Sequence, residues 1–237
     1  MRCGWLLSAI ILGACSPTVS GEVRDATSDR PIAHAIVEVT TSGWGMRDGG
    51  LVWEKDYSYR AETGDDGRFR VHGVDGGHQL AVRAPGYPPL QTSLCSRVPM
   101  TVYVGGSFDG GDVGKQLSIG TDGAGARVGW RFDGKGAQVS EADADLVALR
   151  PGASDNVKMP LRAPFGMAFL PGTGNPPREP GSGYATERTL DLLDCGWLFV
   201  RTRGAGTVPV RIGSFGLDEP LEGGRYLTLS YAARPAR

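Results

Sequence analysis

The stretch Thr63–Phe69, with the sequence TGDDGRF, decides the fold of this chain of 237 residues. Its Asp66-Gly67 pair separates two runs in which apolar and polar residues alternate. Glycine adopts the positive φ of a tight turn at little cost, and strict alternation is typical of a half-buried strand. The stretch therefore predicts a tight β-hairpin whose second strand begins at Phe69.

Further β-strands are expected on both sides of this hairpin, because alternating and β-branched segments recur between turn residues. The expected strands are Gly21–Asp25, Ala35–Val39, Tyr57–Ala61, Leu80–Ala84 and Val98–Val104. Residues Ser42–Lys55 contain two tryptophans among several glycines and predict a long hairpin excursion. Together these segments predict one small β-domain.

Several segments of this region resemble the carboxypeptidase regulatory-like domain in order and spacing. They are GEVRD at 21–25, PIAHAIV at 31–37, TGDDGRF at 63–69, GHQL at 77–80 and APGY at 84–87. The resemblance covers about residues 19–104 and implies a transthyretin-like (prealbumin-type) β-sandwich. His34 and Ser28 stand where the family usually has glycine, and the excursion Ser42–Lys55 is longer than is usual there. These departures make any binding surface common to the family doubtful for this chain.

Residues 108–237 contain short apolar runs between Gly, Pro and Asp clusters. Trp197–Thr202 and Val208–Ile212 flank a Gly-Ala-Gly turn and predict a hairpin. Gly172–Gly183 is rich in Pro and Gly and is interpreted as a flexible loop. Helical periodicity is weak everywhere except over Thr186–Leu193. The predicted fold class is all-β, with an N-terminal transthyretin-like sandwich followed by a second domain, also interpreted as a β-sandwich.

The N-terminal segment predicts export. A basic residue, an apolar run from Trp5 to Leu12 and small residues before a cleavage site are typical of a secretory signal. The run is shorter than the roughly 18 residues that a membrane-spanning helix requires. Residues 1–14 are therefore interpreted as a signal peptide, and residues 15–20 as a tether.

Leu12-Gly13-Ala14-Cys15 resembles a bacterial lipobox, which predicts lipidation of Cys15 with palmitate or similar acyl chains. Several acyl chains on one cysteine anchor a protein stably. An ordinary signal peptide with a chance cysteine is the alternative. Ser16 follows where Asp would favour inner-membrane retention. We therefore expect a lipid-anchored protein of the bacterial cell envelope, at the outer membrane, on its periplasmic or surface face.

Removal of the signal peptide lowers the basic residues from 25 to 24, against 26 acidic residues. The resulting formal net charge of −2 predicts no attraction of the whole protein to nucleic acid or anionic lipid. With Cys15 lipidated, Cys95 and Cys195 form a candidate disulfide in an oxidising envelope. Two buried free thiols are the alternative.

No catalytic motif is recognisable in the sequence. Zinc peptidases that contain this kind of domain need a His-x-x-Glu pair on a separate domain. Here His34, His72 and His78 all lie in the regulatory-like region, and none is followed by Glu at the third position. A metal between His72 and His78 is conceivable, but surface histidines are the better interpretation. Serine-nucleophile and phosphate-loop motifs are missing as well. We expect no enzyme activity, no metal and no cofactor.

Clustered acidic residues at Glu141, Asp143 and Asp145 are interpreted as a solvated strand face, with calcium binding as the alternative. The tryptophans Trp130 and Trp197 lie within expected strands and are assigned to the core.

Four aromatic residues are candidates for ligand binding. They are Trp44, Trp53, Tyr57 and Tyr59. Aromatic rings on the loops of a β-sandwich stack on sugars or receive a peptide segment. Packing into the sandwich core or a domain interface is the alternative for the same rings.

The expected function is that of a non-enzymatic envelope lipoprotein that acts as a binding or assembly module. Its expected partners are the membrane, through Cys15, and a glycan, a peptide or another envelope protein. Two alternatives stay open. In the first, the chain is an accessory or catalytic subunit of an envelope hydrolase, with its activity in residues 108–237. In the second, it is a structural spacer.

Overall fold

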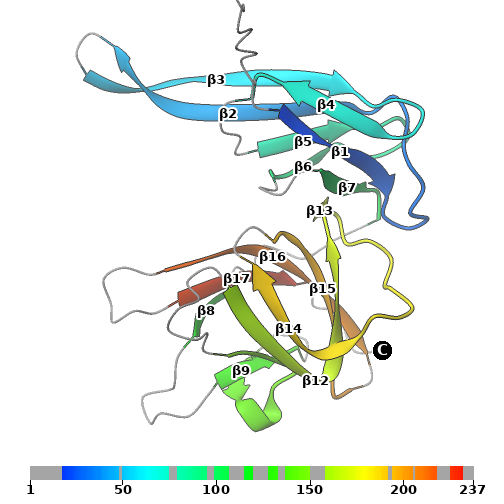
Figure 1. The fold of residues 1–237 in the computed structure, drawn as a ribbon, viewed down its shortest axis with the longest axis vertical. Helices are drawn as coiled ribbons and strands as arrows, with labels where there is room; N and C mark the ends of the chain where they lie inside the picture. The colour runs from blue at the N-terminus through cyan, green and yellow to red at the C-terminus, as the bar shows by residue number, and fades with distance from the viewer. Residues whose placement is uncertain are drawn as a thin grey trace, which may run out of the picture.

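The computed structural model describes residues 18–47, 50–74, 79–94, 99–106, 115–119, 128–132, 137–149, 158–191, 194–204, 206–217 and 225–231. These residues form β-strands and one short 3-10 helix, η1 (Glu141–Asp143). The strands make three sheets, which form an N-terminal part and a C-terminal part (Figure 1). The all-β prediction is confirmed.

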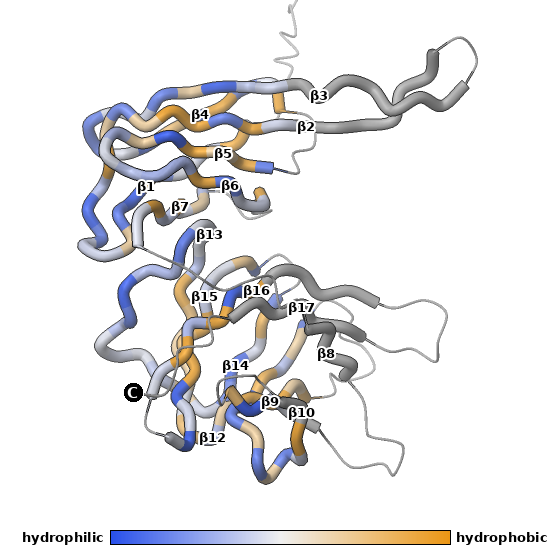
Figure 2. The backbone as a smooth tube through the Cα atoms, turned by 180° about the vertical axis from the view of Figure 1, so that it is seen from behind, coloured by the Kyte–Doolittle hydropathy of each residue, from blue (hydrophilic) through white to orange (hydrophobic). Residues whose placement is uncertain are grey.

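Two four-stranded sheets form the N-terminal part, in the orders β13-β7-β1-β4, where β13 is Thr173–Gly174, and β3-β2-β5-β6. Its own strands are β1 (Thr18–Asp25), β2 (Ile36–Arg47), β3 (Gly50–Glu62), β4 (Arg68–His72), β5 (Gln79–Arg83), β6 (Leu90–Ser93) and β7 (Met100–Val104). Buried and exposed residues alternate along β4, and hydropathy alternates along the strands in Figure 2. The inward residues of both sheets, among them Val23, Val37 and Val102, form one core.

The turn at Thr63–Phe69 joins the two sheets and does not close a hairpin. Strand β3 pairs with β2, whereas β4 pairs with β1, so the predicted hairpin is wrong. Gly67 has a φ of +73°, and its amide donates to the Gly64 carbonyl at 2.8 Å. The Gly67 carbonyl accepts a hydrogen bond from the Val23 amide at 2.8 Å. The local turn chemistry was therefore predicted correctly, but the chain crosses to the other sheet after it.

Strands β2 and β3 continue beyond the sandwich as a two-stranded ribbon, which is visible in Figure 1. Strand β2 pairs with β5 only from Ile36 to Thr40. Beyond Thr40 the described part of β2 pairs only with β3, as far as Arg47 opposite Gly50. We call residues 41–47 and 50–57 the ribbon. It corresponds to the expected hairpin excursion.

The C-terminal part is one nine-stranded sheet in the order β10-β9-β11-β12-β15-β16-β17-β8, with β14 paired to β12. Its strands are β8 (Lys115–Ile119), β9 (Val128–Arg131), β10 (Ala137–Ser140), β11 (Leu146–Ala148), β12 (Lys158–Pro171), β14 (Ala185–Asp191), β15 (Gly196–Arg201), β16 (Thr207–Leu217) and β17 (Arg225–Tyr231). The hairpin formed by β15 and β16 matches the prediction. The described residues of Thr186–Leu193, the one segment with helical periodicity, form part of strand β14 instead of a helix.

Strand β15 is buried on both faces. Leu198 and Val200 belong to a core that also contains Trp130, whereas Trp197 and Phe199 form a second cluster on the other face. Trp130 and Trp197 are 3% and 0% exposed. The assignment of both tryptophans to the core is therefore confirmed.

Residues 172–184, which we call the connector, link the two parts. Strand β13 (Thr173–Gly174) pairs in parallel with β7 and extends the N-terminal sheet. The Asn175 amide donates to the Tyr103 carbonyl at 2.9 Å, and the Arg178 amide donates to the Ala26 carbonyl at 2.7 Å. The interpretation of this segment as a loop is wrong for Thr173–Gly174, which form β13, whereas residues 175–184 belong to no strand or helix.

Candidate functional site

The ribbon places two of the candidate aromatic residues directly opposite each other. Trp44 is the register partner of Trp53, and Thr41 is the partner of Tyr57. The side chains of Trp44, Trp53 and Tyr57 lie outside the described part of the structure. Tyr59 is half-buried and packs against the N-terminal core, as in the alternative interpretation of these rings. The register pair at the tryptophans could not be derived from the sequence alone.

The lipidation candidate Cys15 and the signal peptide lie outside the described residues. Within the described residues, no helix has the length and apolar character needed to cross a membrane. Cys195 forms a disulfide and packs against the N-terminal core. Its partner is one of Cys3, Cys15 and Cys95, all of which lie outside the described residues. The pairing of Cys95 with Cys195 stays a prediction.

The two described histidines each lie at the surface beside a polar partner. His34 has a φ of +57°, and its Nδ1 atom lies 2.8 Å from Glu62 Oε1. His72 Nδ1 lies 3.3 Å from Thr18 Oγ1. Among the residues that the structure describes, no group of three or more His, Cys, Asp and Glu side chains is arranged to hold a metal ion. His78 lies outside them.

The three acidic residues predicted to form a solvated face, Glu141, Asp143 and Asp145, differ in their burial. Glu141 and Asp143 lie in η1, where they form ion pairs with arginines. Asp145 is only 2% exposed, and its carboxylate accepts hydrogen bonds from the amides of Phe132 at 2.9 Å and Arg203 at 3.0 Å. The prediction is therefore wrong for Asp145, which fixes two backbone segments to each other.

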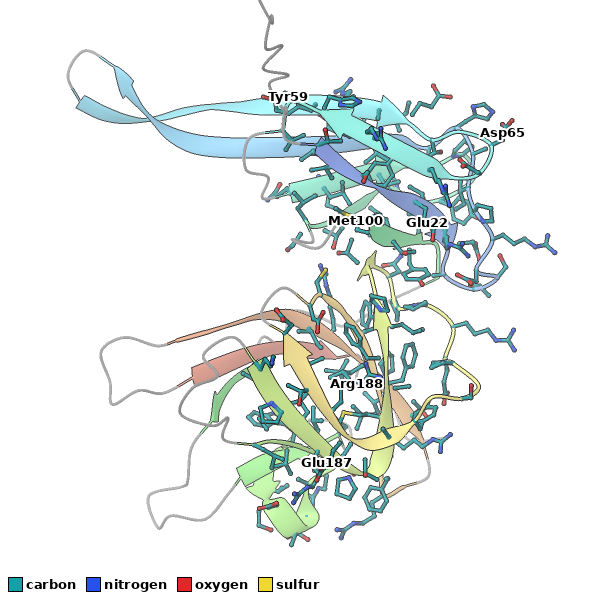
Figure 3. The ribbon with its side chains drawn as sticks, viewed as in Figure 1. Glu22, Tyr59, Asp65, Met100, Glu187 and Arg188 are labelled. Atoms are coloured by element: carbon teal, nitrogen blue, oxygen red, sulfur yellow. The ribbon has the colours of Figure 1, made fainter. Side chains whose placement is uncertain are left out.

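A cleft of about 690 Å³ lies over the outer face of β4, β1 and β7. Its lining includes Ser20, Glu22, Glu62, Arg68, Phe69, Arg70, Met100 and Thr101. Figure 3 shows Glu22 and Met100 close together on neighbouring strands. The Glu22 carboxylate accepts two hydrogen bonds from Arg24, at 2.8 and 3.2 Å, which raise the pKa of Arg24. The cleft was not predicted from the sequence, although the alternation R-F-R-V-H at 68–72 is the signal from which this outer face could have been found.

A second cleft, of about 450 Å³, lies between the two parts and is lined by Pro176, Pro177 and Thr207 among others. Beside it, the Tyr184 hydroxyl donates to Glu179 Oε1 at 2.6 Å, and the Arg201 guanidinium lies 3.7 Å from the centre of the Tyr184 ring. Burial and the hydrogen bond to Glu179 raise the pKa of Tyr184 to about 12. This cluster fixes the C-terminal end of the connector.

Comparison with known families identifies the N-terminal part. A family model described as the carboxypeptidase regulatory-like domain matches residues 18–103. This segment is a regulatory-like domain. The match confirms the predicted resemblance and the transthyretin-like sandwich, and it covers just over a third of the chain. Searches among curated proteins and among solved structures gave no match.

The regulatory-like domain of this chain contains a strand that the family match does not include. Thr173 and Gly174 of β13 pair with Val102 and Tyr103, although they follow the matched segment by many residues. Sequence comparison therefore marks the domain at 18–103, while the sheet of that domain ends at β13. We call residues 108–237 the C-terminal domain, as in the sequence analysis.

Proposed function

We propose that this chain is a non-enzymatic lipoprotein of the bacterial cell envelope that acts as a binding or assembly module. In this proposal, acyl chains on Cys15 hold the protein to the outer membrane. The ribbon captures a glycan or a peptide through Trp44 and Trp53. The C-terminal domain is held against the regulatory-like domain by the connector.

The observation that supports this proposal is the extent and register of the ribbon. Beyond Thr40 its described residues pair only with each other, and Trp44 is opposite Trp53. Residues directly opposite in an antiparallel pair share one face of the sheet. Two tryptophans on one face supply a large contact area and a polar N–H group at a low cost in conformational entropy.

The ribbon is tested by the double variant Trp44→Ala/Trp53→Ala, with Trp44→Phe/Trp53→Phe as the matched control. The alanine variant is expected to lose capture of peptidoglycan fragments and envelope peptides, while its free energy of unfolding changes by less than about 1 kcal/mol. The phenylalanine variant is expected to retain part of the capture. A large loss of stability would assign these tryptophans to a packed core and favour the spacer function.

The anchor is tested separately by labelling cells with radioactive palmitate. The wild-type chain is expected to incorporate the label and to fractionate with the outer membrane. Cys15→Ser is expected to remove both properties. Unchanged labelling of the serine variant would contradict lipidation at this position.

A further inference from the structure

We infer that the outer face of β1 and β4 binds the phosphate groups of anionic lipids at the membrane surface. The inference rests on the proposed anchor at Cys15. It concerns a face of the regulatory-like domain that is separate from the ribbon.

The first argument is the cationic character of β4. Phe69 and Val71 point into the core, so Arg68, Arg70 and His72 share the exposed outer face. The Arg68 side chain is 76% exposed, and its Nε atom lies 3.7 Å from Asp66 Oδ2. Arg70 forms no ion pair within the part of the chain that the structure describes. Its guanidinium therefore remains available to an external anion.

Hydroxyl groups accompany these cations. Ser20 is the register partner of Arg70, and Thr18 is the partner of His72. Ser20 and Arg70 line the cleft over this face together with Thr101. A phosphate group offers several acceptor oxygens, which match the forked donors of arginine and the neighbouring hydroxyls. The chemistry of the face therefore fits a phosphate.

The carboxylates of Glu22, Glu62 and Asp66 near this face each lie beside an arginine or a histidine side chain. Glu22 lies 2.8 Å from the Arg24 guanidinium, and Glu62 lies 2.8 Å from His34. The row of register pairs runs from Thr18 opposite His72, through Ser20 opposite Arg70, to Glu22 opposite Arg68. The end of the face nearest to Thr18 therefore contains the hydroxyls, His72 and Arg70, whereas Arg68 lies farther along, beside Glu22.

The short distance in sequence between this face and Cys15 indicates that the phosphate it binds belongs to a membrane lipid. Thr18 follows Cys15 by three residues, which span at most about 11 Å. Arg70 lies about 7 Å farther along the sheet, because two residues of a strand rise by that distance. A lipid anchor at Cys15 would hold Arg70 close to the headgroups. The net charge of the whole protein matters less there, since fields are screened over about 8 Å at physiological salt.

The test measures vesicle binding by a mature chain with Cys15→Ala, which cannot be lipidated. The probes are phosphatidylcholine vesicles with and without phosphatidylglycerol. The wild-type face is expected to bind more tightly when phosphatidylglycerol is present. Arg68→Gln/Arg70→Gln is expected to lose about fivefold in affinity for each arginine. Arg83→Gln/Arg178→Gln removes the same charge from exposed positions elsewhere and serves as the matched control.

An unchanged affinity of the Arg68/Arg70 variant would overturn the inference, as would a lack of preference for phosphatidylglycerol. An equal loss in both double variants would also overturn it, because only net charge would then matter. These outcomes do not depend on lipidation, because the chain tested has no Cys15 thiol. Failure of palmitate labelling would instead contradict the anchor and leave the vesicle result as measured.

Discussion

The ribbon is a long excursion from the regulatory-like domain and the connector is one from the C-terminal domain, and they differ in where their backbone hydrogen bonds go. The ribbon satisfies its backbone groups internally, since β2 and β3 pair with each other from Thr41 to Arg47. The connector forms backbone hydrogen bonds with the regulatory-like domain, through β13 and the amides of Asn175 and Arg178. Both segments are rich in glycine.

The difference shows that glycine is required for close packing of the backbone in the connector but not in the described part of the ribbon. In the connector, Gly174 has a φ of +92°, and a Cβ atom there would lie 2.2 Å from the Tyr103 carbonyl oxygen. Close backbone approach to β7 thus requires glycine at this position. The ribbon meets no third strand among the described residues, so its sequence is constrained by its own register. We expect stability to depend strongly on the connector and binding to depend on the ribbon.

The largest effect is expected for Gly174→Ala. A side chain at this φ is strained, and its Cβ collides with a carbonyl that cannot move without breaking β13 from β7. We expect a loss of about 3 kcal/mol or more in the free energy of unfolding, measured by urea denaturation. Gly204→Ala is the control, because the nearest atom to a Cβ there is 3.9 Å away. Similar losses of stability for both variants would show that the close approach of β13 to β7 does not require glycine at position 174.

A smaller effect is expected for Thr173→Val. Thr173 is 4% exposed, its Oγ1 lies 2.7 Å from Thr92 Oγ1, and it donates to the Ser93 carbonyl at 3.2 Å. Removing its hydroxyl takes one hydrogen-bond partner from the buried Thr92 hydroxyl, which keeps its bond from Arg211, and we expect a loss of about 1–3 kcal/mol. Thr92→Val and the double variant complete a thermodynamic cycle. If the two single losses simply add, the hydroxyls are not coupled across the domain boundary.

A pH-dependent effect is expected from Tyr184 in the connector. The fold raises the pKa of this phenol from 10.0 to about 12, so it favours the neutral form. The contribution to stability is therefore fully present below about pH 10 and is lost as the pH rises to about 12. The free energy of unfolding, measured across this pH range, should fall more steeply for the wild type than for Tyr184→Phe. Parallel pH profiles would contradict the role of the bond to Glu179.

The smallest effect on stability is expected from removing the ribbon. Replacement of residues 42–56 by Asn-Gly joins Thr41 to Tyr57 through a two-residue hairpin loop. The free energy of unfolding should change by less than about 1 kcal/mol, because no other described strand pairs with this segment. Capture of peptidoglycan fragments should be lost completely. A melting temperature far below that of the wild type would place the ribbon among the structural elements.

The regular strands were predictable from sequence because their periodicity is local. Phe69 and Val71 alternate with Arg68 and Arg70, and the turn chemistry around Gly67 was correctly assigned. The pairing partner of β4 was not predictable in the same way. A turn between two strands fits a hairpin and a sheet crossing equally well, and only packing of the whole core distinguishes them.

The docking of the connector and the burial of Asp145 were not predicted from the sequence, for a related reason. Proline and glycine in residues 172–184 do mark the end of a regular strand, but composition does not show whether another domain satisfies the backbone. Asp145 lies among other acids in the sequence, and its burial depends on the amides of Phe132 and Arg203, which are distant in the chain. The ribbon was foreseen as an excursion, whereas the register that pairs Trp44 with Trp53 required the structure.

The late arrival of β13 has a consequence for the order of folding. During synthesis the chain emerges from its N-terminus, so β7 is complete well before Gly174 becomes available. Until then one edge of the sheet remains open, and open edges recruit strands from other chains. The folding intermediate would be most vulnerable to aggregation in this interval, and the arrival of β13 would shorten the open edge by covering Val102 and Tyr103 from within the same molecule.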